Sequence, residues 1–419
     1  MTKESIENPT SSTKASTLSG AQRAGFSELE FTIFIAATVS IIAFSVDIML
    51  PALLDIGNEY QLTDPNDAQL VIVAFIFSLG VSQLFFGPLT DAYGRRIILT
   101  FALLSFAITS VAALFAPNFA SLLFVRVLAG ASAGAARTAA QAIVRDCYSG
   151  NDMARVMSNV MAVFMVAPLI APAIGQYIIY IANWHWIFLF LGAGGSLTYF
   201  IAFIRLKETQ NIEDRMSLSI AHVVEAFRES LRYRRPVGYC IVAIAFSGAL
   251  FTYVVTIAQV FGELYGMGSN FIYAFMIAAA SMAISSVING RIVKNTPLRK
   301  IVHFSILVFL AVTVIFFVAA NFATVPFALM LFVTIMTMLL FGFVVANTTA
   351  IALEPLGHIA GTASSVLNTM SVSFGALIGG VLGQLYDGTI IPMANGYLIL
   401  GIVSLIAALW AERWRMTLK

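Results

Sequence analysis

Long apolar stretches alternate with short polar connections along nearly the whole chain. Each stretch has about 20 residues, the length that an α-helix needs to cross the hydrocarbon core of a membrane. The pattern predicts twelve membrane-spanning helices, which begin near residues 31, 68, 97, 119, 154, 186, 237, 270, 299, 324, 359 and 391. The sequence therefore predicts an all-α membrane protein.

The longest internal polar segment, residues 207–236, separates six predicted helices from another six. We expect two six-helix bundles, at residues 30–206 and 237–412, with a disordered tail at 1–29 and a short tail at 413–419. Within the polar segment, apolar positions at helical spacing lie opposite arginines: Ile220, Val223, Val224, Phe227 and Leu231 against Arg228, Arg232, Arg234 and Arg235. This indicates an amphipathic helix on the inner membrane surface, and a solvated tether is the alternative.

Composition agrees with lipid as the main solvent. The chain is 59% hydrophobic and 11% charged, whereas soluble domains carry about 25% charged residues. The net charge of +2 is dispersed, which argues against nucleic-acid binding. The two cysteines and four scattered histidines predict neither a disulfide framework nor a metal site, and no phosphate-binding glycine loop is present. We therefore expect no cofactor, and ATP is not the evident energy source.

Basic residues decide the orientation. Of the 23 lysines and arginines, all but Arg126 and Arg137 fall in the tails or in alternate connections. The opposite connections carry acidic residues instead. Because the number of helices is even, both termini lie on one side, and the positive-inside rule places that side in the cytoplasm.

Asp47 is the one carboxylate that lies firmly inside an apolar span. Burying an ionised side chain in a membrane helix costs about 2.5–3.5 kcal/mol, so such residues usually face a wet cavity and often relay protons or bind ions. Asp47 is therefore a candidate for proton coupling or cation recognition, unless it lies nearer the outer interface and is solvated there. Pro51, four residues on, can bend this helix and free the carbonyl of Asp47.

Arg126 lies about eight residues into the fourth predicted helix and cannot readily lose its charge. It either responds to a nearby carboxylate or serves as a structural or snorkelling residue. Arg137, near the inner end of the same helix, is the better candidate for snorkelling. Gly130 and Gly134 give the helix a face of small residues suited to close packing.

The connection between the second and third predicted helices carries the pattern Gly-x-x-x-Asp-x-x-Gly-Arg-Arg, formed by Gly87, Asp91, Gly94, Arg95 and Arg96. A connection this short joins antiparallel helices, and its charges stay at the water boundary. We expect a hairpin whose turns depend on the two glycines.

The fifth predicted helix contains Pro168, Pro172 and Gly175 near its middle. Each proline removes a backbone hydrogen bond, so we expect a bend. Bends of this kind matter where helix bundles move against each other, although they also occur in static helices.

The Gly87 to Arg96 pattern resembles the signature loop of the major facilitator superfamily of secondary transporters. Over nearly all of residues 30–412 the chain resembles the bicyclomycin-resistance (Bcr/CflA) type of drug:proton antiporter. The matching segments are Asp47-Ile48-Met49-Leu50-Pro51, Arg126 with Ala142-Ile143-Val144-Arg145-Asp146, the Pro168 to Gly175 region, Asn289-Gly290-Arg291 and Gly361-Thr362-Ala363-Ser364. The resemblance implies the major facilitator fold.

It also implies roles for single residues. Asp47 would exchange protons and assist cationic substrates, and Arg126 would respond to its charge. The residues Gly87, Asp91, Gly94, Arg95, Arg96 and Arg145 would form a conformational latch at the inner face. Gln141 and Gln176 stand where relatives often have arginine and glycine, and we group them with Phe251 and Tyr253 as candidate cavity-lining residues.

We therefore expect a monomeric, proton-coupled exporter of small amphipathic compounds or drugs in a bacterial cytoplasmic membrane. Its partners would be protons, a small-molecule substrate and lipid. A transporter dedicated to a single metabolite is the alternative. An enzyme is disfavoured, because the spans contain no nucleophile-base pair or paired acids.

Overall fold

A computed structural model of the chain describes residues 19–211, 213, 215 and 220–414. Within these ranges the protein is helical and contains no β-strand. Twelve helices among the described residues are long and apolar enough to cross a membrane. Each begins within four residues of its predicted start, because uninterrupted apolar length is a signal that the sequence carries directly.

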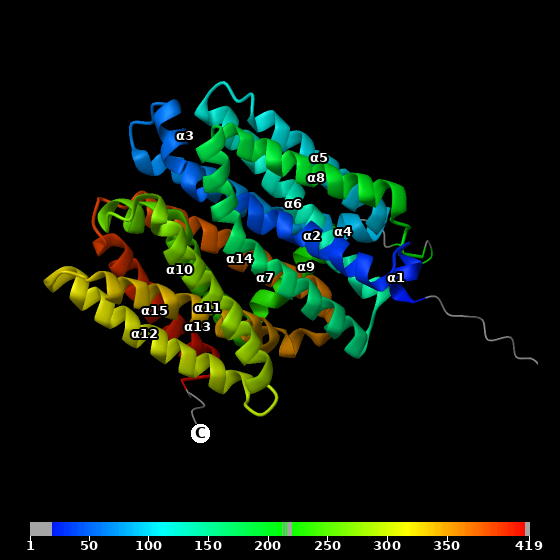
Figure 1. Ribbon diagram of the computed structural model, residues 1–419. Coiled ribbons are helices and arrows are strands. Elements are labelled where there is room, and N and C mark those ends of the chain that lie inside the picture. Colours follow the sequence, from blue (N-terminus) through cyan, green and yellow to red (C-terminus); the bar gives the residue numbers. More distant parts are fainter. Residues whose placement is uncertain (1–18, 212, 214, 216–219, 415–419) are drawn as a thin grey trace, which may run out of the picture.

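The helices form two bundles of six (Figure 1). The first bundle contains α2 (Glu28–Asp47), η1 (Leu50–Ala52), α3 (Leu53–Glu59), η2 (Pro65–Gln69), α4 (Leu70–Tyr93), α5 (Arg95–Ala113), α6 (Phe119–Cys147), α7 (Gly150–Ile181) and α8 (His185–Arg205). The second contains α10 (Arg234–Ile257), η4 (Ala258–Leu264), η5 (Gly268–Asn270), α11 (Phe271–Ile292), α12 (Leu298–Phe322), α13 (Phe327–Leu353), η6 (Glu354–Ile359), α14 (Ala360–Gln384) and α15 (Ile391–Ala411). The first span is built from α2, η1 and α3 together.

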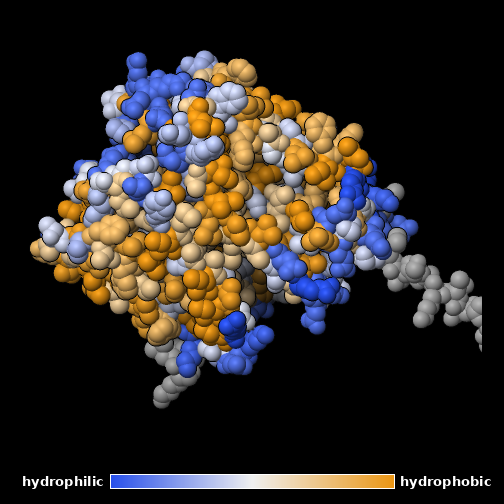
Figure 2. Space-filling view, in the orientation of Figure 1, coloured by the Kyte–Doolittle hydropathy of each residue, from blue (hydrophilic) through white to orange (hydrophobic). Residues whose placement is uncertain are grey.

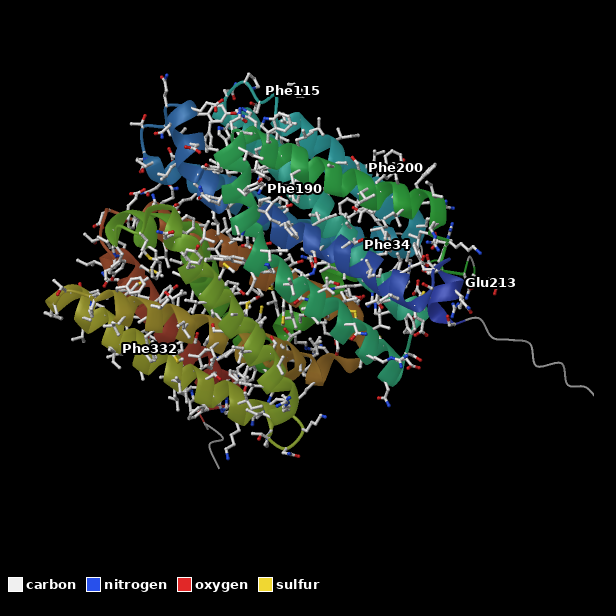
Figure 3. All side chains as sticks on the ribbon, viewed as in Figure 1. Phe34, Phe115, Phe190, Phe200, Glu213 and Phe332 are labelled. Atoms are coloured by element: carbon white, nitrogen blue, oxygen red, sulfur yellow. The ribbon has the colours of Figure 1, made fainter. Side chains whose placement is uncertain are left out.

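Polar residues gather at opposite ends of the molecule, with a broad apolar surface between them (Figure 2). The acidic end holds the connections with Asp55, Glu59, Asp64, Asp67, Glu263 and Asp387, and the basic end those with Arg95, Arg145, Arg205, Arg234, Arg299 and Arg413. Large side chains such as Phe200 and Phe332 are exposed on the apolar surface (Figure 3). An apolar band of this kind fits a lipid environment.

The start of the chain differs from the expectation. Residues 1–18 lie outside the described residues, but the chain is folded from Ser19 on, whereas we expected disorder up to residue 29. Ser19 caps the short helix α1 (Gly20–Arg23), and Phe26 is buried beneath the Arg205 guanidinium at 5.1 Å. Arg205 also pairs with Glu30, so a few apolar and charged contacts hold this segment against the first bundle.

The polar segment between the bundles contains the predicted helix, α9 (Ile220–Arg232). It contacts α10 and α14 of the second bundle and α4 of the first. Its location at a membrane surface stays a prediction.

Candidate functional site

The first span bends next to its carboxylate. The helix α2 ends at Asp47, and Pro51 lies in the 3₁₀ turn η1 that follows. Pro51 has no N–H to offer the Asp47 carbonyl, and the Met49 N–H donates to the Val46 carbonyl at 3.3 Å. The predicted interruption of this helix is therefore present.

A glycine of the fifth span fits against this bend. A Cβ on Gly175 would lie 2.3 Å from the Ile48 carbonyl oxygen, so only glycine allows α7 to come this close. Pro168 and Pro172 lie inside α7, which continues as one helix from Gly150 to Ile181. The three predicted positions thus belong to the helix that supports the bend.

Asp47 is only 6% exposed, and its side chain has no hydrogen-bond or ion-pair partner among the described residues. The turn η1 that follows it contacts α10 of the second bundle. On α10, Tyr253 is 2% exposed, and its hydroxyl has no hydrogen-bond partner within the described part of the chain. Two buried polar side chains without a hydrogen-bond partner among the described residues, one from each bundle, thus lie on elements that meet between the bundles.

Arg126 is buried between helices of the first bundle. Its Nε donates to the Val71 carbonyl at 3.0 Å, its Nη2 donates to the Ser45 carbonyl at 2.9 Å, and its guanidinium stacks on Phe75 at 4.4 Å. No ion pair joins it to Asp47 in this conformation of the described residues. Arg126 therefore holds the backbone two residues before Asp47, rather than the carboxylate itself.

The remaining predicted lining residues are dispersed. Gln141, Gln176 and Phe251 are half-buried, whereas the ring of Tyr253 is buried and stacks on Phe275 with centroids 5.9 Å apart. Their roles as lining residues stay predictions.

At the acidic end, amide side chains join the two bundles. Asn66 Nδ2 donates to the Tyr386 carbonyl at 2.8 Å, and Gln384 Nε2 donates to the Asn66 carbonyl at 2.8 Å. Gln69 Nε2 donates to Gln259 Oε1 at 2.6 Å, and Gln259 Nε2 donates to Asn66 Oδ1 at 2.8 Å. This uncharged network, the amide seal, closes the acidic end between the bundles.

The helices α4 and α14 continue that contact toward the middle of the molecule. A Cβ on Gly380 would lie 2.9 Å from the Val73 side chain, and a Cβ on Gly80 would lie 3.0 Å from the Ser373 backbone nitrogen. Ser373 Oγ also donates to the Phe77 carbonyl at 3.3 Å. Small residues thus let the two bundles touch closely along this line.

At the basic end, Arg95 is the centre of a charge cluster. It is 8% exposed, and it pairs with Asp91 and Asp146, each at 2.9 Å. Its Nη1 also donates to the Thr90 carbonyl at 2.8 Å. Arg95 and Asp91 were predicted, but Asp146 was not.

The predicted hairpin is wrong, whereas the latch role of Arg145 stays a prediction. The expected hairpin is reduced to one residue, because α4 continues through Gly87 and Asp91 to Tyr93 and only Gly94 breaks the helix, with φ +101°. Arg145 is exposed and forms no ion pair among the described residues; its Nη1 would lie 3.7 Å from a Cβ on Gly361 of the second bundle. One helix position separates Arg145 from Asp146, and that rotation of about 100° decides which side chain meets Arg95.

Glu208 completes the cluster and was missed by the sequence analysis. Its carboxylate accepts from the backbone N–H groups of Arg95 at 3.0 Å and Arg96 at 3.3 Å, so it caps the start of α5. A Cβ on Gly94 would lie 2.5 Å from Glu208 Oε2 and would clash with it. This position therefore requires glycine both for its positive φ and for the space that Glu208 occupies. Arg96 itself donates to the Phe203 carbonyl.

The second bundle repeats this arrangement. Arg299, near the start of α12, pairs with Glu354 at the end of α13 and lies 3.4 Å from Glu412, directly after α15. Arg95, Asp146 and Glu208 occupy the corresponding places in the first bundle. The repeat consists of contacts between helix ends rather than of a shared loop motif.

Comparison with known proteins decides the family. The sequence matches the family model described as Major Facilitator Superfamily over residues 33–380. The chain belongs to the Major Facilitator Superfamily. The twelve spans in two bundles of six are the fold predicted from the signature pattern.

Relatives in this superfamily confirm the narrower resemblance. The chain is 29% identical over 371 residues to an uncharacterized MFS-type transporter, YdgK, of Bacillus subtilis, which covers 87% of this chain and 90% of that one. It is also 28% identical over 373 residues to a bicyclomycin resistance protein homolog of Haemophilus influenzae. This alignment covers 84% of this chain and 88% of the relative. Among solved structures, the human organic anion transporter MFSD10 (TETRAN) matches with a TM-score of 0.66 at 16% identity, covering 92% of this chain and 99% of that one; this likeness concerns the fold alone.

Proposed function

We propose that this protein is a proton-coupled antiporter that exports small amphipathic compounds, drugs among them, from the bacterial cytoplasm. Asp47 is the observation that supports the proposal most strongly, as a buried carboxylate without a partner among the described residues, next to the interface between the bundles. The name of the bicyclomycin resistance relative supports an antimicrobial substrate. In the orientation expected from the positive-inside rule, the basic end faces the cytoplasm and the acidic end faces outward.

Coupling follows from the energy of a buried charge. An ionised Asp47 is costly where the bundles close around it, so protonation favours the closed site. Water or an amphipathic cation next to Asp47 favours the ionised form. Proton and substrate therefore compete for one side chain, and each is bound in turn as the site opens to opposite sides.

The two ends of the molecule support alternating access. The amide seal closes the end that we place outside, and its hydrogen bonds join neutral side chains that can exchange them for water. Opening this end requires α4 and α14 to separate, while the charge cluster at Arg95 keeps the inner ends of α4, α5 and α6 together as one body. The protein carries out this cycle as a monomer with lipid around it.

The test is transport by purified protein in liposomes under an imposed pH gradient. Ethidium, bicyclomycin and a set of unrelated neutral compounds are offered to the intact protein, to Asp47→Asn and to Asp55→Asn. Asp55 is an exposed carboxylate in the same span and serves as the matched control. We expect gradient-driven accumulation of several compounds, lost in Asp47→Asn and kept in Asp55→Asn.

Substrate exchange without a gradient separates coupling from binding. Asp47→Asn should still exchange labelled for unlabelled neutral substrate, because it keeps the shape of the site. Gradient-driven transport by Asp47→Asn would refute the coupling role. Inhibition by only one metabolite among the competitors would favour the transporter dedicated to a single compound.

A further inference from the structure

A cavity of about 620 Å³ opens at the basic end, where α9, the start of α10 and the end of α15 meet. Its lining includes the four arginines Arg232, Arg234, Arg235 and Arg413, together with Tyr233 and Glu412. Four arginines stand against one glutamate, so the lining carries an excess of three positive charges. A concave surface with this charge attracts an anion.

The arginines differ in how they are held. Arg235 lies 3.5 Å from Glu412, and Arg234 stacks over the Trp410 ring at 4.8 Å. Glu412 is shared with Arg299, outside the cavity, which weakens its compensation of Arg235. Arg232 and Arg413 are exposed and pair with no carboxylate among the described residues. The guanidinium groups of Arg232 and Arg413 are thus available to a ligand, whereas those of Arg234 and Arg235 are held by contacts within the protein.

The chemistry of these groups favours a phosphate. A guanidinium donates two parallel hydrogen bonds that match two phosphate oxygens, and its charge is permanent. A site with two available guanidinium groups can contact all of the charged oxygens of one phosphate group. Inorganic phosphate, a soluble phosphate ester and a phospholipid headgroup share this chemistry.

The position of the cavity favours the lipid. It lies at the ends of two membrane-spanning helices, α10 and α15, where lipid headgroups are found. Next to it, α9 exposes Val224 (58%), Phe227 and Leu231 (44%) at the spacing of one helix face. An exposed apolar face beside clustered arginines is the pattern of a helix that lies in an anionic membrane surface.

We propose that this cavity binds the headgroup of an anionic phospholipid of the inner leaflet. Arg232 and Arg413 donate to the phosphate, Arg234 and Arg235 supply charge behind it, and the apolar face of α9 rests among the first carbons of the acyl chains. This site is separate from Asp47, and binding at it requires no transport.

The test measures binding of phosphatidylglycerol to the purified full-length protein in a neutral detergent by native mass spectrometry, with phosphatidylethanolamine as the zwitterionic comparison. The variant Arg232→Gln/Arg413→Gln removes two charges from the cavity. The variant Arg291→Gln/Lys294→Gln removes two exposed charges from the same end of the molecule, outside the cavity, and is the matched control. All four positions are exposed, so the fold should be kept.

We expect the cavity variant to bind phosphatidylglycerol about 30-fold more weakly, since each basic residue near an anionic lipid contributes a factor of about five and the two factors multiply. The control should change by less than about threefold, and Arg232→Lys/Arg413→Lys should regain part of the affinity. Equal weakening in both glutamine variants would overturn the proposal in favour of diffuse attraction. Displacement of the lipid by millimolar inorganic phosphate or glycerol phosphate would overturn the choice of lipid over a soluble ligand, and equal binding of phosphatidylethanolamine would overturn the requirement for an anion.

Discussion

The close contact between α4 and α14 gives a sharp prediction for Gly80→Ala. The new Cβ would lie 2.2 Å from Ser373 Oγ, and 3.0 Å from the Ser373 backbone nitrogen in the other bundle. The hydroxyl can rotate away, but the backbone nitrogen can move only with α14. The substitution therefore disfavours the conformation in which the bundles touch here, while leaving each bundle intact.

The magnitude follows from the cost of overpacking. Inserting a methyl group into a tight contact costs about 1–3 kcal/mol, which changes the ratio of closed to open acidic end by about 5- to 150-fold. Spin labels at Thr63→Cys and Glu263→Cys, two exposed positions at the acidic end in different bundles, report that ratio by double electron–electron resonance. Both native cysteines are buried, and they are replaced by alanine in this background.

We expect Gly80→Ala to increase the population with the longer distance between labels. Gly194→Ala is the matched control, because a Cβ on Gly194 meets nothing within 4 Å. An unchanged distance distribution in Gly80→Ala, or the same change in Gly194→Ala, would refute the reasoning that this contact controls the closed state.

The other predictions concern the basic end. Glu208→Ala removes the acceptor of two N–H groups at the start of α5 and should lower the free energy of unfolding by about 0.5–2 kcal/mol. The loss should appear as a lower midpoint of thermal unfolding in detergent. Glu225→Ala, which changes an exposed residue on α9, should leave the midpoint unaltered. Glu412→Gln should lower the free energy of unfolding by about 1.5–3 kcal/mol, because Arg299 and Arg235 lose a shared carboxylate. An unchanged midpoint of thermal unfolding would contradict this. Gly87→Ala should leave the midpoint unchanged or slightly raised, since a Cβ there meets nothing within 4 Å; a clear loss of stability would show that the signature glycine supports this conformation.

Much of the fold could be predicted because membrane helices depend on length and composition. The bend at Pro51 and the isolated carboxylate of Asp47 were also visible, since each is a local exception within an apolar run. Gly175 was singled out because it lies near two prolines. The structure explains why this position is glycine, because a side chain there would clash with the Ile48 carbonyl oxygen.

The contacts between distant segments could not be predicted in the same way. Glu208 reaches Arg95 across 113 positions of sequence, and nothing in its own neighbourhood marks it. Asn66, Gln69 and Gln259 are ordinary polar residues at helix ends until the two bundles bring them together. Sequence patterns report what a residue does to its own helix, whereas these residues act on another one.

The repeated charge clusters have a consequence for how the chain is made. In each bundle the final acid of the cluster follows the sixth helix, as Glu208 in the first bundle and Glu412 in the second. During synthesis, the first cluster can close as soon as Glu208 has left the ribosome, while the second bundle is still being inserted. The second cluster has to wait for Glu412, which follows the last helix of the second bundle. Each half therefore carries its own closing step, and the first half can reach its final helix arrangement before the second half has been synthesised.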